Sequence, residues 1–217
     1  MTYQYTPPPS GEVEEDESAR IGVIAEDVAE WSRRLSSALL ESTGEGLLDR
    51  LRVEADVLRT LVDGAESVDG KQPVAAPYRD RKGRLRNLTN PVLSARNPIA
   101  PPMTLIKSGA ESEFSVTLPI QFQGPPKTLH GGFVSVLLDE TLWHAVRTAS
   151  GGMSFTRELT VSYERPVPLA VPLAVRGRVT SVDGRKTYAE GEILADGLVC
   201  AHASGLWIAP RPRVEHP

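Results

Sequence analysis

The sequence of 217 residues has a single cysteine and no excess of positive charge, its formal net charge being −4 at pH 7. One cysteine excludes an intrachain disulfide and a cysteine-rich zinc site. Cys200 lies among apolar residues of a strand-like run, so we interpret it as a buried small hydrophobic residue rather than a nucleophile. The negative net charge provides no basic surface, which disfavours nucleic-acid binding.

Other features that the sequence lacks narrow the class of protein further. There is no apolar run long enough to span a membrane and no charged-then-apolar leader after Met1, so we expect a cytoplasmic protein. No G-x-S-x-G stretch is present, which argues against a serine hydrolase. The histidines do not have the spacing of metal ligands, so no metal site is expected. We expect no other cofactor. These histidines are His130, His144, His202 and His216.

The first hundred residues divide by composition into three segments. Residues 1–18 combine three consecutive prolines with an acidic cluster, which predicts a disordered acidic tail. In residues 19–64 apolar positions recur every three or four residues, with a break near Gly44, which predicts a helical hairpin that packs on the main domain or at an oligomer interface. Residues 65–100 are rich in Gly, Pro and Asn and read as an extended connector. Its two Asn-Pro pairs, Asn90-Pro91 and Asn97-Pro98, predict turns.

Beyond the connector, residues 101–211 have the pattern of a second domain, followed by a short tail at 212–217. Its hydrophobic period is two, except between residues 132 and 149, where a helix apolar on nearly every side is expected. The pattern predicts one or two strands, this core helix and then four strands joined by hairpins. An antiparallel sheet with one apolar face would cover such a helix by curling around it. Strand-like runs cover 114–122, 155–163, 171–180, 186–194 and 198–208, with hairpin signals at Val182-Asp183-Gly184 and Ala195-Asp196-Gly197.

The expected core helix opens with the turn His130-Gly131-Gly132. The first N–H groups of a helix have no intrahelical partner, so this turn can hold an anion or an oxyanion. Further along, Asp139 lies on an apolar face beside Val136 and Trp143. A carboxylate in such surroundings is costly to bury unless it has a use, and perturbed carboxylates cluster at functional sites. We interpret Asp139 as a functional residue.

The next residue, Glu140, points about 100° away from Asp139 around the helix. On that side it lies near His144 and Arg147, one helical turn or two turns further along. We interpret Glu140 as a member of a structural ion pair rather than as a second catalytic carboxylate.

The stretch from Gly124 to Gly132, continued through Leu138-Asp139-Glu140, resembles the PaaI-type acyl-CoA thioesterases, which have the hotdog fold. The resemblance continues through Thr156, the segment 163–169 and the turn 182–186, which are similar to thioesterase superfamily enzymes that hydrolyse longer fatty acyl-CoAs. It covers roughly residues 101–210. It implies an α+β hotdog domain, a curved antiparallel sheet wrapped around a central helix, carrying an N-terminal helical extension.

The resemblance also implies a role for each motif residue. Asp139 would act as nucleophile or as general base on a water, and Gly132, with Gly131 beside it, would donate the backbone N–H that polarises the thioester carbonyl. Thr156 would position the attacking water and His130 would orient the thioester. Many relatives have an asparagine shortly before the turn, and Gln123 stands near that place as a candidate substrate contact.

The implied activity is hydrolysis of a medium- or long-chain fatty acyl-CoA to free acid and coenzyme A, coenzyme A being part of the substrate. Val136 and Trp143 would line the path of the acyl chain. Arg185 and Lys186, in a turn, would contact the coenzyme A phosphates, although solvated charges are the ordinary interpretation of such a pair. A hotdog enoyl-CoA hydratase or dehydratase and a non-catalytic acyl-CoA-binding module are the alternative functions.

The spacing of the motif predicts how the chains assemble. Asp139 lies eight residues beyond Gly131, about 12 Å along one helix, too far for both to reach one carbonyl. Two antiparallel core helices across a two-fold axis would bring each helix start beside the partner's Asp139. We therefore expect a homodimer with composite active sites, with a tetramer left open.

Overall fold

The computed structural model describes residues 15–41, 44–63, 78–79, 85–86 and 90–211. The chain divides into two compact units, Met1–Ala100 and Pro101–Pro217. No helix in the described ranges is long and apolar enough to cross a membrane. The candidate site lies in the second unit, so the first unit is described briefly.

The first unit contains the two helices α1 (Glu15–Glu41) and α2 (Glu45–Asp63). Helix α1 begins four residues before the end of the predicted disordered tail, so residues 15–18 are helical, and residues 1–14 lie outside the described part. Acidic residue types are favourable in the first turn of a helix, which accounts for the earlier start. The break near Gly44 separates the two helices as expected.

The segment predicted as an extended connector contains a short antiparallel pair, β1 (Tyr78–Arg79) with β2 (Leu85–Arg86). The two Asn-Pro turns are confirmed. Asn90 Oδ1 accepts hydrogen bonds from the backbone N–H groups of Val92 and Leu93 at 2.7 and 2.8 Å. Asn97 Oδ1 accepts one from the N–H of Ile99 at 3.1 Å. Such side-chain bonds to the following backbone are the reason asparagine favours turns.

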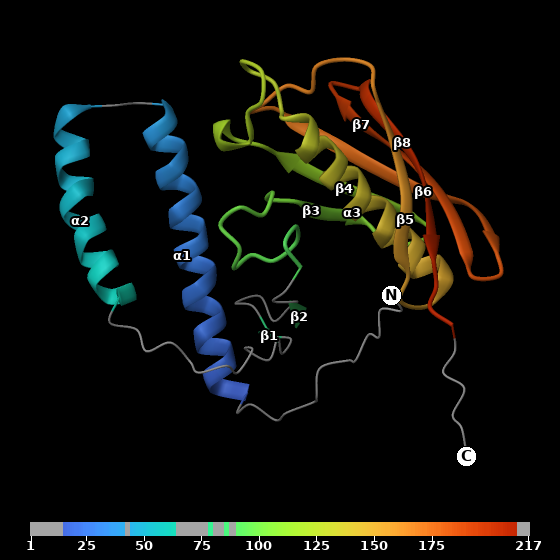
Figure 1. Cartoon of the computed structure of the whole chain (residues 1–217), viewed down its shortest axis with the longest axis horizontal. Helices are drawn as coiled ribbons and strands as arrows, with labels where there is room; N and C mark the ends of the chain where they lie inside the picture. The colour runs from blue at the N-terminus through green and yellow to red at the C-terminus, as the bar shows by residue number, and fades with distance from the viewer. Residues whose placement is uncertain (1–14, 42–43, 64–77, 80–84, 87–89, 212–217) are drawn as a thin grey trace. The chain divides into compact units, whose positions relative to one another are not determined.

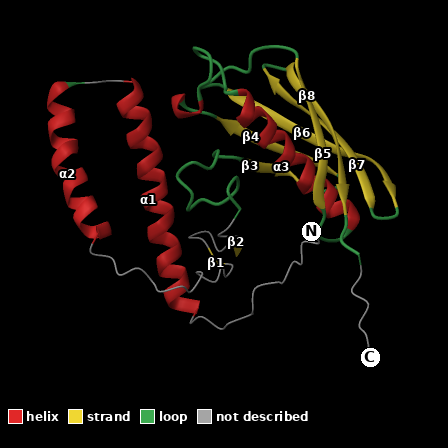
Figure 2. Ribbon diagram, in the orientation of Figure 1, coloured by secondary structure: helices red, strands yellow, loops and turns green. Residues whose placement is uncertain are grey.

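The second unit is a six-stranded antiparallel sheet with one long helix, α3, across one face (Figures 1 and 2). The strand order β3-β4-β6-β7-β8-β5 leaves β3 and β5 at the two edges. This confirms the predicted hotdog fold, with two strands before the helix and four after it. The strands are β3 (Thr104–Lys107), β4 (Glu111–Thr117), β5 (Phe155–Tyr163), β6 (Pro172–Asp183), β7 (Lys186–Ala195) and β8 (Leu198–Ile208).

Helix α3 (Gly131–Ser150) confirms the predicted core helix. It begins after His130 and ends at Gly151, which has φ of 69°, a left-handed conformation that glycine adopts without strain. Its buried residues pack against the inner face of the sheet, where Val175 and Ile193 are fully buried. The buried residues of α3 are Val134, Leu137, Leu138, Glu140, Thr141, Leu142, Ala145 and Val146.

One strand prediction is wrong at its end. Strand β4 stops at Thr117, and Ile120–Phe122, expected to continue it, forms a 3₁₀ turn. Pro119 lacks the N–H that a sheet ladder needs, so the strand cannot continue through it. Both predicted hairpin turns are confirmed by the pairing of β6 with β7 and of β7 with β8. Cys200 is buried in β8, as predicted.

Candidate active site

The start of α3 is capped by the side chain of His130. Its Nδ1 atom accepts a hydrogen bond from the backbone N–H of Gly132 at 3.0 Å. The N–H predicted to polarise the substrate carbonyl is therefore occupied by the cap. The neighbouring N–H of Gly131 donates to no group in the described part of the chain. Of the two glycines, Gly131 is the one that retains a donor for an oxyanion.

The loop before the helix is shaped by Gly124 and Gln123. A Cβ atom at Gly124 would lie 2.8 Å from the Cα of His130, so only glycine lets the loop pass so close to the cap. The Oε1 atom of Gln123 accepts a hydrogen bond from the N–H of Lys127 at 2.7 Å. Gln123 thus fastens its own loop, and the direct substrate contact considered from the sequence stays a prediction.

Asp139 and Thr156 come together, as the motif required. Thr156 stands opposite the fully buried Trp207 in the register of β5 and β8, which puts Thr156 on the face of the sheet that carries α3. Its hydroxyl donates a hydrogen bond to Asp139 Oδ1 at 3.0 Å. Burial raises the pKa of the Asp139 carboxyl above its ordinary value, and the bond from Thr156 acts in the opposite direction. A carboxylate with a raised pKa is the form expected of a general base.

Sequence reasoning missed a contact between β5 and the helix start. The hydroxyl of Tyr163 donates a hydrogen bond to the carbonyl oxygen of Gly131 at 3.0 Å and lies 3.1 Å from Ser135 Oγ. The alternation of the sequence predicts only which face of β5 carries Tyr163. Which residue of α3 it contacts depends on the register of the sheet, so the sequence did not show this contact. Tyr163 therefore helps to fix the backbone of the residue whose N–H is unoccupied.

The two residues predicted to line the acyl path, Val136 and Trp143, are half-buried on α3. The indole N–H of Trp143 donates to the carbonyl oxygen of Ser154 at 3.0 Å, and the guanidinium carbon of Arg147 lies 5.5 Å from the centroid of its ring. The ring is thus held in place. The contact of both residues with a substrate chain stays a prediction.

Glu140 is buried, with 9% of its surface exposed, whereas Asp139 is only half-buried. Burial, and then the nearby charge of Arg147, lower the pKa of His144. The ring of His144 packs edge-on against Phe114, with ring centroids 5.4 Å apart. Glu140 and the ring of His144 thus pack toward the core.

Arg185 and Lys186 occupy the turn between β6 and β7, and both are exposed. Arg185 Nη1 donates to the carbonyl oxygen of Ala209 at 2.9 Å, which ties the end of β8 to this turn. Lys186 pairs with Ile208, and Ile208 pairs with Phe155, the neighbour of Thr156. The turn and the Asp139–Thr156 pair are therefore at the same end of the sheet, about two strand spacings of 4.8 Å apart.

Strand β5 has a bulge between Thr156 and Glu158, where Arg157 is the extra residue. Bulges re-aim side chains and are common beside active sites. Arg157 is exposed and is a third cation near the same sheet end.

Within one chain, the helix start is not brought close to Asp139, and no metal-ligating side chains are grouped in the described ranges. The start of α3 and Asp139 remain eight residues apart on one straight helix, about 12 Å, so no single carbonyl reaches both within a chain. In the described ranges no three His, Cys, Asp or Glu side chains are grouped so that they could hold a metal ion.

Part of this chain is similar in sequence to known thioesterases. The sequence model of the thioesterase superfamily matches residues 126–201, a range that contains His130, Asp139 and Thr156. An acyl-coenzyme A thioesterase of Xenopus laevis, THEM4, is 31% identical over 88 residues, 40% of this chain and 39% of that protein. This chain thus matches about two fifths of the length of that relative.

Among solved structures, a crystal structure of a thioesterase superfamily protein is 29% identical and covers 94% of both chains, with a TM-score of 0.68. The phenylacetic acid degradation protein PaaI from Thermus thermophilus, in a mutant structure, is 19% identical over 49% of this chain and 91% of that one, with a TM-score of 0.46.

The wrapped helix, the strand order and the matches define the second unit as a hotdog-fold domain. Residues 126–201 of this domain match the thioesterase superfamily, and the whole chain is similar to a solved member of it.

Proposed function

We propose that the protein is an acyl-CoA thioesterase that hydrolyses the thioester to a free acid and coenzyme A. The observation that carries the proposal is the half-buried Asp139 carboxylate, with its raised pKa and the hydrogen bond from Thr156, on the central helix of a thioesterase superfamily domain. Asp139 acts as general base on a water or as nucleophile. Thr156 holds the carboxylate in place and orients the attacking water.

The second requirement is a donor where negative charge develops on the carbonyl oxygen. A backbone N–H in that position contributes roughly 2.7–4 kcal/mol to catalysis in known enzymes. We assign this role to Gly131, because its N–H is unoccupied while that of Gly132 is bound by His130. His130 then acts by capping the helix, and Tyr163 by holding the Gly131 carbonyl.

Because the donor and the carboxylate are about 12 Å apart on α3, the complete site needs two chains. We propose a homodimer in which the start of one α3 lies beside Asp139 of the partner's α3. Strand β5 supports this arrangement, since it is an edge strand with none of its residues buried, and Phe155 and Tyr163 are 42% and 55% exposed. An edge with exposed aromatic side chains is a surface that association would cover.

For the substrate we propose a medium- or long-chain fatty acyl-CoA. The acyl chain follows Val136 and Trp143 on the side of α3 that carries Asp139. Each buried CH₂ contributes roughly 0.8 kcal/mol, so affinity rises with chain length until the path ends.

The test is a thiol-release assay with short, long and aromatic acyl-CoAs. We expect release of thiol by the wild-type protein and a loss of about 10²–10⁴ in kcat for Asp139→Asn, which has the same shape but cannot take a proton. Asp196→Asn, in the exposed β7–β8 turn, is the matched control and should keep wild-type activity.

The outcomes also separate the alternative functions. Absorbance change with enoyl-CoA without thiol release would identify a hydratase or dehydratase. Tight binding of acyl-CoA that Asp139→Asn leaves unchanged, without turnover, would identify a binding module. A preference for acetyl-CoA over every longer chain would contradict the fatty acyl substrate.

A further inference from the structure

Helix α1 carries a row of large apolar side chains that are exposed. Trp31, in the middle of the row, is 72% exposed, and the other three are between 39% and 61% exposed. A contiguous apolar surface of this kind marks an interaction site. We call the row the α1 seam, and it consists of Ile24, Val28, Trp31 and Leu35.

The side of α1 opposite to the seam is already packed. Ala29 is buried, and Arg33 Nη1 donates to the carbonyl oxygen of Asn97 at 3.0 Å. At 100° per residue, Ala29 and Arg33 lie roughly 130–170° around the helix from the middle of the seam. The seam therefore faces away from the segment of its own unit that holds α1 in place.

The seam has the spacing of a coiled coil. Its residues follow one another at intervals of four, three and four positions. This is the heptad pattern that keeps apolar residues in line when two helices supercoil, with Val28 and Leu35 at position a and Ile24 and Trp31 at position d. Asp27 and Arg34 then occupy the flanking position g.

We propose that the α1 seam pairs with the α1 seam of a second copy as an antiparallel two-stranded coiled coil. In such a pair position a faces position d, so Val28 lies against the partner's Trp31 and Ile24 against the partner's Leu35. Each large indole thus meets a small side chain. A parallel pair in register would instead place Trp31 against the partner's Trp31, and the two large rings would crowd one layer.

The flanking charges select the same direction. In the antiparallel pair position g faces position g, so Asp27 lies beside the partner's Arg34, and two-fold symmetry repeats this pair. In a parallel pair position g faces position e, where Asp27 would meet the partner's Ser32 and Arg34 the partner's Leu39. Only the antiparallel arrangement pairs opposite charges, and charges at these positions determine the orientation of coiled coils.

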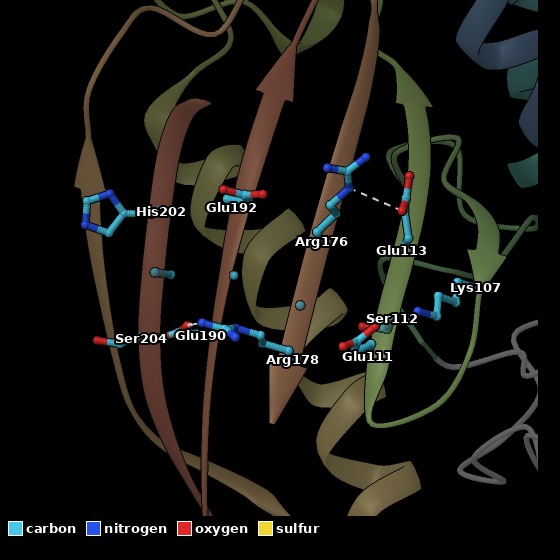
Figure 3. A pocket seen from close by; sticks show the side chains of 13 residues that line it. Lys107, Glu111, Ser112, Glu113, Arg176, Arg178, Glu190, Glu192, His202 and Ser204 are labelled. Atoms are coloured by element: carbon cyan, nitrogen blue, oxygen red, sulfur yellow. Dashed lines mark hydrogen bonds and ion pairs between the residues drawn. The ribbon is translucent and has the colours of Figure 1, made fainter. Parts of the chain in front are cut away.

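Both charged groups can take part in such a pair. Arg34 is exposed and forms no ion pair within the described ranges. In this it differs from Arg176 and Arg178, which both pair with glutamates of their own chain in the hollow of the sheet (Figure 3). Asp27 is half-buried, and a carboxylate has about four acceptor positions, so it can hold the partner's Arg34 besides contacts within its own chain.

The length of α1 is sufficient for a specific interface. In this register residues 19–41 overlap with the same residues of the partner, over about 34 Å. A helix is about 14 Å across when a water radius is included, and covering about 40% of that surface buries roughly 600 Å² per copy, or about 1,200 Å² in total. The proposal concerns the first unit and does not depend on thioester hydrolysis.

The test is disulfide cross-linking of the full chain carrying both Ile24→Cys and Leu35→Cys. Within one helix these positions are about 16 Å apart, too far for a disulfide, whereas in the antiparallel pair each faces the other in one layer. In a glutathione redox buffer we expect a covalent dimer on a denaturing, non-reducing gel. Each single variant should remain at the mass of one chain, because equal positions of the two helices are then also about 16 Å apart.

The matched control is Glu30→Cys with Glu41→Cys, which has the same separation along α1 but lies on exposed positions outside the seam. It should not cross-link, and neither should the wild type, whose Cys200 is buried. Circular dichroism verifies that every variant is folded. A folded double variant of the seam that stays unlinked would overturn the proposal. So would linkage of either single variant, which would indicate a parallel pair.

The charges are tested in the same double-cysteine chain. Arg34→Asp makes position g negative on both helices and should slow the linkage, whereas Asp27→Arg together with Arg34→Asp exchanges the pair and should restore the rate. Equal rates in all three chains would contradict the charge pairing that selects the antiparallel direction.

Discussion

At the scale of single residues, the site depends on what occupies each polar atom. The Asp139 carboxylate receives one side-chain hydrogen bond, from Thr156, and is otherwise affected mainly by burial, which raises its pKa. The N–H of Gly132 is taken by His130, while the N–H of Gly131 is not. In the proposed mechanism these two observations divide the roles: Asp139 moves a proton, the N–H of Gly131 stabilises charge, and His130 holds the turn that presents this N–H.

The contact between Thr156 and Asp139 makes a prediction about pH. A base works as its carboxylate, so activity falls as the pH drops through its pKa, here above the value of about 3.9 for an ordinary aspartate. The Thr156 hydroxyl lowers the pKa of Asp139, so Thr156→Ala should move the acid limb of the kcat/KM profile to higher pH. Thr156→Ser keeps a hydroxyl and should retain the wild-type limb. Identical acid limbs in the alanine variant and the wild type would show that the hydroxyl does not act on the base.

At the scale of elements, the start of α3 allows the deletion of a single N–H. Gly131 is the first residue of the helix, where proline is well tolerated, and His130 before it has the extended backbone that proline requires, with φ −61° and ψ 131°. Gly131→Pro should lower kcat by about 10²–10³ with little change in stability, because it removes only the oxyanion donor. Gly131→Ala retains the N–H, and its Cβ would meet Tyr163 at an ordinary 3.5 Å. If both variants lose activity equally, the N–H is not the cause.

The turn between β6 and β7 is the second element with a testable role. Arg185 and Lys186 stand at the sheet end that carries Thr156, and the nucleotide of coenzyme A is strongly anionic. Arg185→Ala with Lys186→Ala should raise KM for acyl-CoA and leave kcat nearly unchanged, and added salt should shrink the difference. Steady-state kinetics at two ionic strengths measure this. An unchanged KM would remove the turn from the binding site.

The hydrophobic period was enough to predict most of these elements. The sequence predicted α3, its end at Gly151 and the four strands that follow, because burial on one side repeats every two or 3.6 residues. It failed at Ile120–Phe122, where apolar residues alternate but Pro119 breaks the ladder. The sequence named both glycines of the turn as the donor, and spacing does not show that the His130 side chain occupies the N–H of Gly132 and leaves that of Gly131. The contact of Tyr163 depends on the register of the sheet and that of Gln123 on the path of its loop, and the hydrophobic period predicts neither.

At the scale of the whole molecule, the proposed mechanism needs two chains, because the Gly131 donor and the Asp139 carboxylate are too far apart in one chain to act on one carbonyl. Each chain holds one donor and one carboxylate, at positions about 12 Å apart, and strand β5 beside them is an uncovered edge. In the proposed dimer every site takes its N–H from one chain and its carboxylate from the other. In a dimer of one chain that lacks the donor and one that lacks the carboxylate, both defects then fall in one site and the other site is intact.

This separation predicts complementation between two inactive variants. In a mixed dimer of an Asp139→Asn chain and a Gly131→Pro chain, one site receives both defects and the other receives neither. Equal amounts unfolded and refolded together should yield about half mixed dimers, each with one intact site, and so about a quarter of wild-type kcat. Each variant refolded alone should remain inactive. If donor and carboxylate acted within one chain, every site would carry a defect, and the mixture would show no thiol release above that of the separate variants.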